Sequence, residues 1–183
     1  SSDLYFETGS THFFVLLSHT LSVEAQCYLW LAFFLSFAIK VPMFPFHIWL
    51  PEAHVEAPTS GSILLAGVLL KMGTYGFFRF MVQLAPAACV YFSPLIFVFC
   101  IVAILYSSFS TIRQIDLKKI IAYASIGHMN FVILGLFTFN VQGLAGSVFL
   151  MLSHGIVSSA LFACIGSLYD RYRTRIIYYY KGL

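Results

Sequence analysis

Residues 40–76 read KVPMFPFHIWLPEAHVEAPTSGSILLAGVLLKMGTYG, and this stretch decides the fold. One apolar segment ends at Lys40, Pro42 and Pro45 interrupt the chain, and a second apolar segment carries Lys71 near its middle. Proline removes a backbone hydrogen bond and clashes with the preceding turn of a helix. Broken helices at membrane depth are tolerated where they face protein or a water-filled cavity, and they commonly mark transport sites. The stretch therefore predicts a broken helix in a membrane transport protein.

The composition of the whole chain also indicates a lipid environment. Of 183 residues, 60% are hydrophobic and 9% are charged, whereas about 25% of the residues of soluble domains are charged. The net charge of +3 comes from short, dispersed basic runs, which do not indicate a nucleic-acid-binding protein. Four scattered cysteines lack metal-ligand spacing, so we interpret them as small hydrophobic residues. They are Cys27, Cys89, Cys100 and Cys164.

Hydrophobic segments predict about five membrane-spanning helices, since a helix needs about 20 apolar residues to cross a bilayer. The segments are 23–50, interrupted by the two prolines, then 59–84, 93–111, 117–139 and 141–169. The apolar patch 13–17 is too short to span. We therefore expect an all-α integral membrane fold, with an N-terminal loop segment at 1–22 and a transmembrane domain at 23–183.

Basic residues set the expected orientation. The loops 112–119 and 170–176 carry several lysines and arginines, whereas residues 85–91 and 139–143 carry none. The positive-inside rule places the basic loops on the cytoplasmic or matrix side. Alternation of the helices then places the loop 51–59 on that same side.

Ionisable residues inside spans are costly and by default mark an ion or substrate path. Lys71 lies about 12 residues, or roughly 18 Å, from either end of its span, too far for its side chain to reach the interface. It is either a structural lysine paired to a neighbour or a proton carrier, and we favour the second. Burial disfavours the ammonium form and a nearby carboxylate favours it, so a moving partner can drive proton exchange. Lys40, at the break, is either a transport residue or a lysine that extends to the interface at a helix end.

Two histidines fall inside later spans. His128 and His154 are each either a hydrogen-bonded buried histidine or a proton-transfer group, because histidine titrates near neutrality through either ring nitrogen. Their presence beside a mid-membrane lysine favours proton transfer. His47, between Pro45 and Pro51, is a weaker candidate for the same chain of groups.

The carboxylates do not fall within the spans. Asp3, Glu7, Glu24, Glu52, Glu56, Asp116 and Asp170 all lie near a predicted helix end or in a loop. Because an unpaired buried lysine is expensive, either the lysines are deprotonated at rest or their counter-ion comes from helices outside this sequence. We favour the second, and therefore expect the chain to be part of a larger working protein. Asp116 is expected to cap the span that starts at Leu117.

The stretch 40–76 together with RQIDLKKIIAYASIGHM (residues 113–129), LSHG (residues 152–155) and LYDR (residues 168–171) resembles the NADH dehydrogenase subunit 4 family of respiratory complex I, in its mitochondrial version. The resemblance covers residues 30–183. It implies an antiporter-like, proton-pumping bundle of inverted repeats, of which this chain is similar to the seventh to eleventh helices. Lys40 matches the lysine of the first broken helix, Lys71 the lysine of the central hydrophilic axis, and His128 and His154 the histidines that continue it.

The resemblance has further implications for cofactors and partners. It implies no redox cofactor in this chain, with flavin and iron–sulfur clusters in other subunits. The implied partners are other membrane-arm subunits, including neighbouring antiporter-like ones, a polypeptide that supplies a glutamate for Lys40, and the lipid of the mitochondrial inner membrane. Two alternatives stay open: a subunit of a multisubunit cation/proton antiporter, and a structural membrane-arm piece without transport. No phosphate loop, metal cluster or nucleophile motif supports a soluble enzyme.

Overall fold

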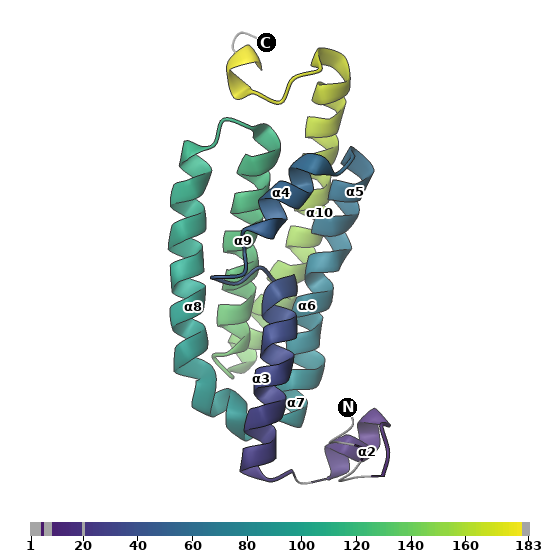
Figure 1. Cartoon of the computed structure of the whole chain (residues 1–183), viewed down its shortest axis with the longest axis vertical. Coiled ribbons are helices and arrows are strands. Elements are labelled where there is room, and N and C mark those ends of the chain that lie inside the picture. The colour runs from purple at the N-terminus through teal and green to yellow at the C-terminus, as the bar shows by residue number, and fades with distance from the viewer. Residues whose placement is uncertain (1–4, 6–8, 20, 181–183) are drawn as a thin grey trace.

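The computed structural model describes residues 5, 9–19 and 21–180, which form a bundle of helices along one long axis (Figure 1). Five helices are long and apolar enough to cross a membrane: α3 (Val23–Lys40), the composite helix Thr59–Leu84, α8 (Pro86–Arg113), α9 (Leu117–Leu136) and α10 (Val141–Tyr172). A short helix, α2 (Phe13–Ser18), precedes them, and a 3-10 turn, η3 (Ile177–Tyr180), follows. The predicted all-α membrane fold is confirmed, and within the described residues strand pairing is limited to one isolated bridge.

The first span breaks after Lys40, as the two prolines predict. α3 ends there, residues 41–48 form turns, and α4 (Trp49–Glu56) resumes the helix. The backbone N–H of Val41 donates to Phe37 O at 2.8 Å, which closes α3. The indole Nε1 of Trp49 donates to Ile39 O at 3.0 Å, so the two halves stay in contact across the break. α4 is too short to be one of the five candidate spans, and it packs on α9.

The second span is a single rod made of α-helical and π-helical turns. Its order is α5 (Thr59–Leu64), η1 (Leu65–Leu69), α6 (Leu70–Gly76), η2 (Phe77–Met81) and α7 (Val82–Leu84), where η1 and η2 are π-helical. The bounds Thr59–Leu84 agree with the predicted segment. The two π-turns were not predicted, because hydrophobicity alone does not distinguish a π-turn from an α-turn.

The other three spans differ from the predicted bounds only at their ends. α8 begins at Pro86 rather than at residue 93, since proline is tolerated in the first helical turn, where its missing N–H has no acceptor. α9 begins after Asp116, whose side chain accepts from Lys118 N at 2.9 Å, which confirms the predicted cap. α10 continues to Tyr172 and ends where Arg173 adopts a left-handed conformation with φ 55°.

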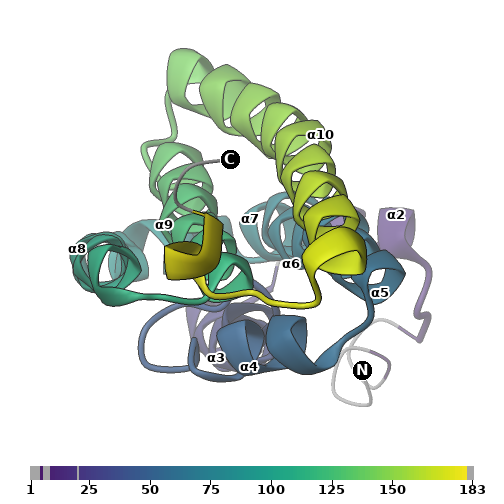
Figure 2. The ribbon, with the colours of Figure 1, turned by 90° about the horizontal axis from the view of Figure 1, so that it is seen from above.

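Aromatic side chains fill the core where α3 meets α8 and the second span. The buried ring of Trp30 stacks on Phe34 at 4.9 Å and on Phe92 at 4.2 Å between ring centroids. Phe77 of η2 packs against Phe37 and Phe137 in the same core. Seen from above, α9 lies between α8 and α10, and the second span and α3 cover its other side (Figure 2). This arrangement brings α6, α9 and α10 together in the middle of the bundle.

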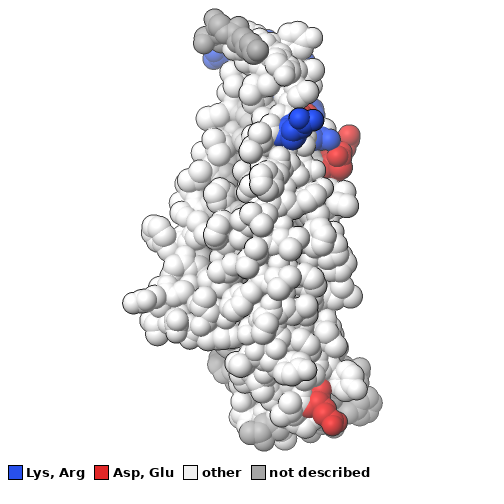
Figure 3. Space-filling model, turned by 90° about the vertical axis from the view of Figure 1, so that its left-hand side faces the viewer, with Lys and Arg blue, Asp and Glu red and all other residues white. Residues whose placement is uncertain are grey.

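Charged side chains are confined to the ends of the molecule over the face that Figure 3 shows, the side on which α8 lies. At one end, Leu117 N donates to Arg175 O at 3.0 Å and Ile177 N donates to Ile115 O at 3.1 Å, so the loops 112–119 and 170–176 are joined. α4 and the loop after it lie against them. We name this region, with Glu52, Lys118, Lys119 and Arg175, the charged end. The segments 51–59, 112–119 and 170–176 lie at one end of the bundle, as predicted. The expectation that 51–59 is a loop is wrong, because α4 (Trp49–Glu56) covers most of it.

Candidate functional site

Three of the predicted residues form a row across the middle of the bundle, which we name the interior row: Lys71, His154 and His128. Lys71 lies in α6, His154 in α10 and His128 in α9. The Nζ atom of Lys71 lies 2.7 Å from Nδ1 of His154, although the two residues are 83 positions apart. The rings of His154 and His128 follow at 5.7 Å between centroids. His154 is buried, Lys71 is half-buried, and His128 faces outward.

The contact between Lys71 and His154 can exist in two protonation states. An ammonium group has only donors, so with charged Lys71 the Nδ1 atom of His154 accepts and its ring proton is on Nε2. With neutral Lys71 the direction reverses, and Nδ1–H donates to the amine. Lys71 Nζ also donates to the backbone oxygen of Ala66. No carboxylate pairs with Lys71 in the described part of the chain, where the ion pair that forms is between Lys119 and Glu52.

Small residues let the helices of the interior row approach each other. A Cβ atom placed on Gly67 would lie 2.6 Å from Ser159 Oγ, and one on Gly155 would lie 3.3 Å from the backbone oxygen of Gly67. The second span and α10 therefore cross with their backbones almost in contact, as small residues allow between membrane helices. This crossing lies directly beside the pair formed by Lys71 and His154.

Lys40 lies at the C-terminal end of α3 and shares a groove with Lys71. The groove has a volume of about 890 Å³ and is lined mainly by apolar side chains from α3, the second span and α10. Lys40 is exposed there, and its position at the last turn of α3 is favourable for a cation because of the helix dipole. α6 packs on the break itself, since a Cβ atom on Gly73 would lie 2.6 Å from Val41 and 3.0 Å from Lys40 Cβ. The structure therefore places both lysines on one groove.

His47 does not join the interior row. It is buried between Phe44 and Tyr106, with ring centroids 5.6 Å and 4.8 Å away, on the side of the break that faces α8. Burial lowers the pKa of His47 below its ordinary value, so the ring stays neutral near pH 7. The weaker expectation that His47 continues the same chain of groups has no direct contact to support it.

A third buried histidine among the described residues, His54 of α4, was not predicted. Its ring is fully buried and stacks on Phe162 of α10 at 4.4 Å between centroids. Neither ring nitrogen has a hydrogen-bond partner among the described residues. Burial, and then the positive charge of Lys118, lowers the pKa of His54 to about 4. The sequence carried no signal for this environment, because the buried face of a helix of eight residues cannot be identified from its pattern.

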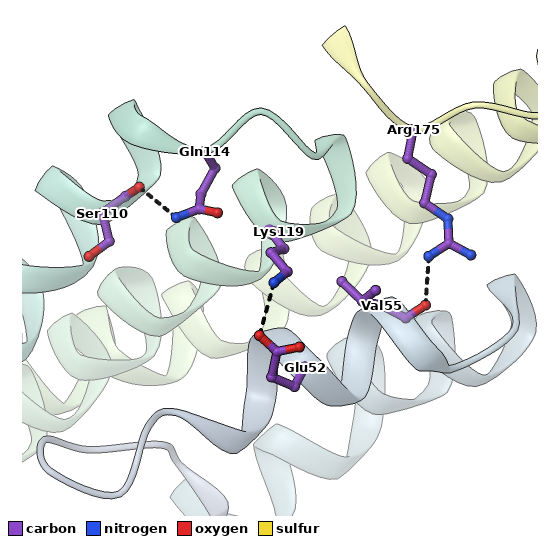
Figure 4. Close-up of polar contacts among 6 residues, drawn as sticks. All are labelled: Glu52, Val55, Ser110, Gln114, Lys119 and Arg175. Atoms are coloured by element: carbon purple, nitrogen blue, oxygen red, sulfur yellow. Dashed lines mark hydrogen bonds and ion pairs between the residues drawn. The ribbon is translucent and has the colours of Figure 1, made fainter.

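At the charged end, basic side chains hold α4 in place. Lys118 Nζ donates to Ala57 O and Arg175 donates from a guanidinium nitrogen to Val55 O, both at 2.8 Å. Lys119 forms an ion pair of 2.9 Å with Glu52. Figure 4 shows Lys119 and Arg175 reaching α4 from two different elements. Cations at the last carbonyls of a helix complement its dipole.

The described residues contain no group of three or more His, Cys, Asp or Glu side chains that could hold a metal ion. Within the bundle, the interior row is the arrangement that can accept, hold and pass on a proton.

Comparisons with known proteins agree with the family that the sequence resembles. Residues 2–183 match the family model of the NADH:quinone oxidoreductase/Mrp antiporter transmembrane proteins. NADH-ubiquinone oxidoreductase chain 4 of Marchantia polymorpha is 61% identical over 98% of this chain, and that of Prototheca wickerhamii is 62% identical over 98%. The alignments cover 36% and 34% of those proteins, so the chain spans about a third of the length of the relatives it matches.

Solved structures show the same fold. A chain in the structure of respiratory complex I from Thermus thermophilus with bound NADH is 34% identical, with a TM-score of 0.92 over 98% of this chain and 39% of that one. A chain of the Mrp complex from Dietzia sp. DQ12-45-1b has a TM-score of 0.80 over 90% of this chain and 31% of that one. At 22% identity, that second likeness shows the fold alone.

Proposed function

Because this chain belongs to the NADH:quinone oxidoreductase/Mrp antiporter transmembrane family, we propose that it is part of a proton-translocating membrane-arm subunit of NADH:ubiquinone oxidoreductase. The single observation that carries the proposal is the 2.7 Å contact between Lys71 and His154. Lys71 bonds a histidine and has no carboxylate paired to it among the described residues, so its charged form is energetically costly within the membrane. Ionisable residues kept at such a cost by default mark an ion path. The relatives named NADH-ubiquinone oxidoreductase chain 4 and the five membrane-spanning helices support a multi-pass membrane protein, which we propose lies in the mitochondrial inner membrane.

The proposed path of the proton follows the interior row. A proton enters near Lys40 from the matrix side, which the segments 51–59, 112–119 and 170–176 face, and reaches Lys71. Lys71 gives its proton to Nδ1 of His154, while Nε2 of His154 releases its own proton towards His128. Each step is a transfer between nitrogen atoms. Lys71 is left neutral until the next proton arrives, and His128 carries the charge until it passes its proton on. His154 is left with its ring proton on Nδ1 and must return to the Nε2–H tautomer before the next transfer. The proton then leaves through helices of the remaining protein.

Coupling to quinone reduction is proposed to act through Lys40. A glutamate on another helix pairs with Lys40, and a change in that pairing alters the charge that Lys71 experiences across the shared groove. The redox chemistry takes place in other subunits, which hold flavin and iron–sulfur clusters. The chain itself supplies proton-transfer groups and binds the neighbouring membrane-arm subunits and lipid.

Replacing Lys71 tests the proposed function. The Lys71→Met variant should assemble, because methionine fills a similar volume in an apolar groove, yet coupled proton pumping should be lost and quinone reduction depressed. Pumping is measured as acidification of coupled membrane vesicles that carry the whole complex. Lys119→Met, the same change at the charged end, is the matched control and should pump normally. Full pumping by an assembled Lys71→Met complex would falsify the role of Lys71 and favour a structural membrane-arm piece.

The family model also includes Mrp antiporter proteins, which favours one alternative, a subunit of a multisubunit cation/proton antiporter. Both functions use the same interior row, so the variant above does not separate them. Purification of the native assembly does. Flavin and iron–sulfur absorbance in the purified material supports the oxidoreductase, and their absence together with cation-dependent proton exchange supports the antiporter.

A further inference from the structure

The first π-turn, η1, ends at Leu69, two residues before Lys71, and changes the hydrogen bonding of one backbone carbonyl. The N–H of Leu70 donates to Leu65 O, five residues back, instead of reaching Ala66 O as it would in a regular α-helix. Ala66 O is thus free of that donor. Lys71 Nζ donates to this oxygen. The π-turn therefore leaves the carbonyl of Ala66 available, and the side chain of Lys71 donates to it in place of the Leu70 N–H.

We propose that η1 is a positioning element for Lys71: the freed carbonyl of Ala66 is a fixed acceptor that holds the Lys71 amine against Nδ1 of His154. This inference rests on the proposed function of the interior row. It adds a backbone group to that row, and it assigns a task to a feature that the hydrophobic pattern of the sequence does not show.

Two physical arguments support this role. A lysine side chain has several rotatable bonds and loses conformational freedom when it is held in one place. The groove beside it, of about 890 Å³, offers Lys71 other directions in which to point. A second acceptor at a fixed place restricts the amine to the one orientation that also reaches His154. Conversely, a backbone carbonyl without a partner in an apolar span is costly, so Lys71 and Ala66 O satisfy each other.

The second π-turn provides an internal comparison. In η2 the N–H of Val82 donates to Phe77 O, again five residues back. The cation of that turn, Arg79, is directed elsewhere, with its guanidinium 4.7 Å from the centroid of the Phe13 ring. η2 is thus a π-turn of the same length in the same span that holds no member of the interior row. Shortening η2 is therefore a control for shortening η1.

Removing one residue from each π-turn tests the proposal in the whole complex. A π-turn accommodates one extra residue, so deletion of the exposed Leu69 should restore α-helical bonding and keep the flanking helix in register. The Leu70 N–H would then lie four residues after Leu65 O, and Ala66 O would accept from the backbone N–H of Lys71. We expect coupled pumping to fall about tenfold, the size of effect when a charged group loses a hydrogen bond. Deletion of Phe78 in η2 should leave the rate within about twofold. Leu69→Ala, which removes the side chain but keeps the backbone, should pump normally.

A substitution of unchanged length covers the case in which the deletion prevents assembly. Leu69→Ser introduces a hydroxyl three residues after Ala66, and serine hydroxyls in this chain donate to such carbonyls, as Ser107 does to Ile104 O at 3.2 Å. Competition for Ala66 O should slow pumping about threefold relative to Leu69→Ala.

A double variant separates positioning from packing. If η1 acts through Lys71, deletion of Leu69 in the Lys71→Met background should not lower the residual rate of quinone reduction further. A further loss there, or equal pumping by Leu69→Ser and Leu69→Ala, overturns the proposal. Normal pumping by the Leu69 deletion would also overturn the proposed role of η1. If Lys71→Met still fails to pump in that case, the proposed function of the interior row stands.

Discussion

Basic side chains gather in two regions of this molecule, and they are bonded differently in each. At the charged end, Lys118, Lys119 and Arg175 each contact an oxygen atom, from Ala57, Glu52 and Val55 respectively. In the interior row, Lys71 contacts a histidine nitrogen in addition to a carbonyl. An oxygen acceptor holds a cation in its charged form, whereas a histidine nitrogen can take the proton itself.

The difference separates cations that hold the structure together from groups that can change protonation. The charged end joins α4 to α9 and to the segment after α10, and its contacts need charges that stay constant. The interior row joins α6, α10 and α9 through groups that each can lose or gain a proton. Substitutions should therefore affect stability at the charged end and proton movement in the interior row.

The largest effect is expected for His154→Gln. The glutamine carbonyl can accept a hydrogen bond from Lys71, so the contact is kept, but an amide does not exchange protons near pH 7. Coupled pumping should fall about a hundredfold or more, the scale of a lost acid–base group. The amount of assembled complex and its thermal midpoint should stay unchanged. Pumping at the native rate by the assembled variant would show that the interior row, like the charged end, has only a structural role.

The sequence predicted the spans and the members of the interior row for different reasons. Hydrophobic length identifies a span, and a lysine or histidine inside one is conspicuous because it is rare there. The contact between Lys71 and His154 could not be predicted from the pattern, since it depends on how the second span crosses α10 at Gly67 and Gly155. The spacing of hydrophobic residues in the sequence does not indicate where the two helices cross.

Two neighbouring lysines show the same limit at the charged end. Lys118 and Lys119 are equivalent in the pattern, yet Lys118 is 2% exposed and donates to Ala57 O, whereas Lys119 pairs with Glu52 at the surface. The sequence predicted the side of the bundle on which both lie. Which of them is buried depends on the position of α4. The two prolines predict the break before α4, but the position of α4 after the break depends on contacts such as that of Trp49 with Ile39 O.

An intermediate effect is expected where the interior row depends on packing. In Gly67→Ala the new methyl group would lie 2.6 Å from Ser159 Oγ. Either the Ser159 hydroxyl must rotate away and lose its 3.4 Å hydrogen bond to Ile63 O, or the second span and α10 must separate. Such overpacking costs about 1–3 kcal/mol, and the separation should also weaken the contact of Lys71 with His154. Both the thermal midpoint of the complex and the rate of pumping should decrease.

Two matched variants sharpen this prediction. Ser159→Ala removes the hydroxyl and leaves Cβ 3.9 Å from the new methyl group, so the double variant should recover most of the lost rate. Gly146→Ala, in the same helix as Ser159, adds a methyl group with nothing within 4 Å and should change neither property. A failure of Ser159→Ala to rescue would show that the crossing is not what Gly67→Ala disturbs.

The smallest effect is expected for the ion pair at the charged end. The side chains of Lys119 and Glu52 are 28% and 60% exposed, and ion pairs in such surroundings contribute about 0.2–1 kcal/mol. Lys119→Met and Glu52→Gln should each lower the thermal midpoint slightly, and the double variant should lower it by less than the sum, because both single changes break the same pair. High salt should reduce the difference from the native complex. Protons pumped per NADH oxidised should equal the native value in all three. A lower ratio in assembled complexes would instead place Lys119 on the proton path, since a contact that only anchors α4 has no means of altering the ratio.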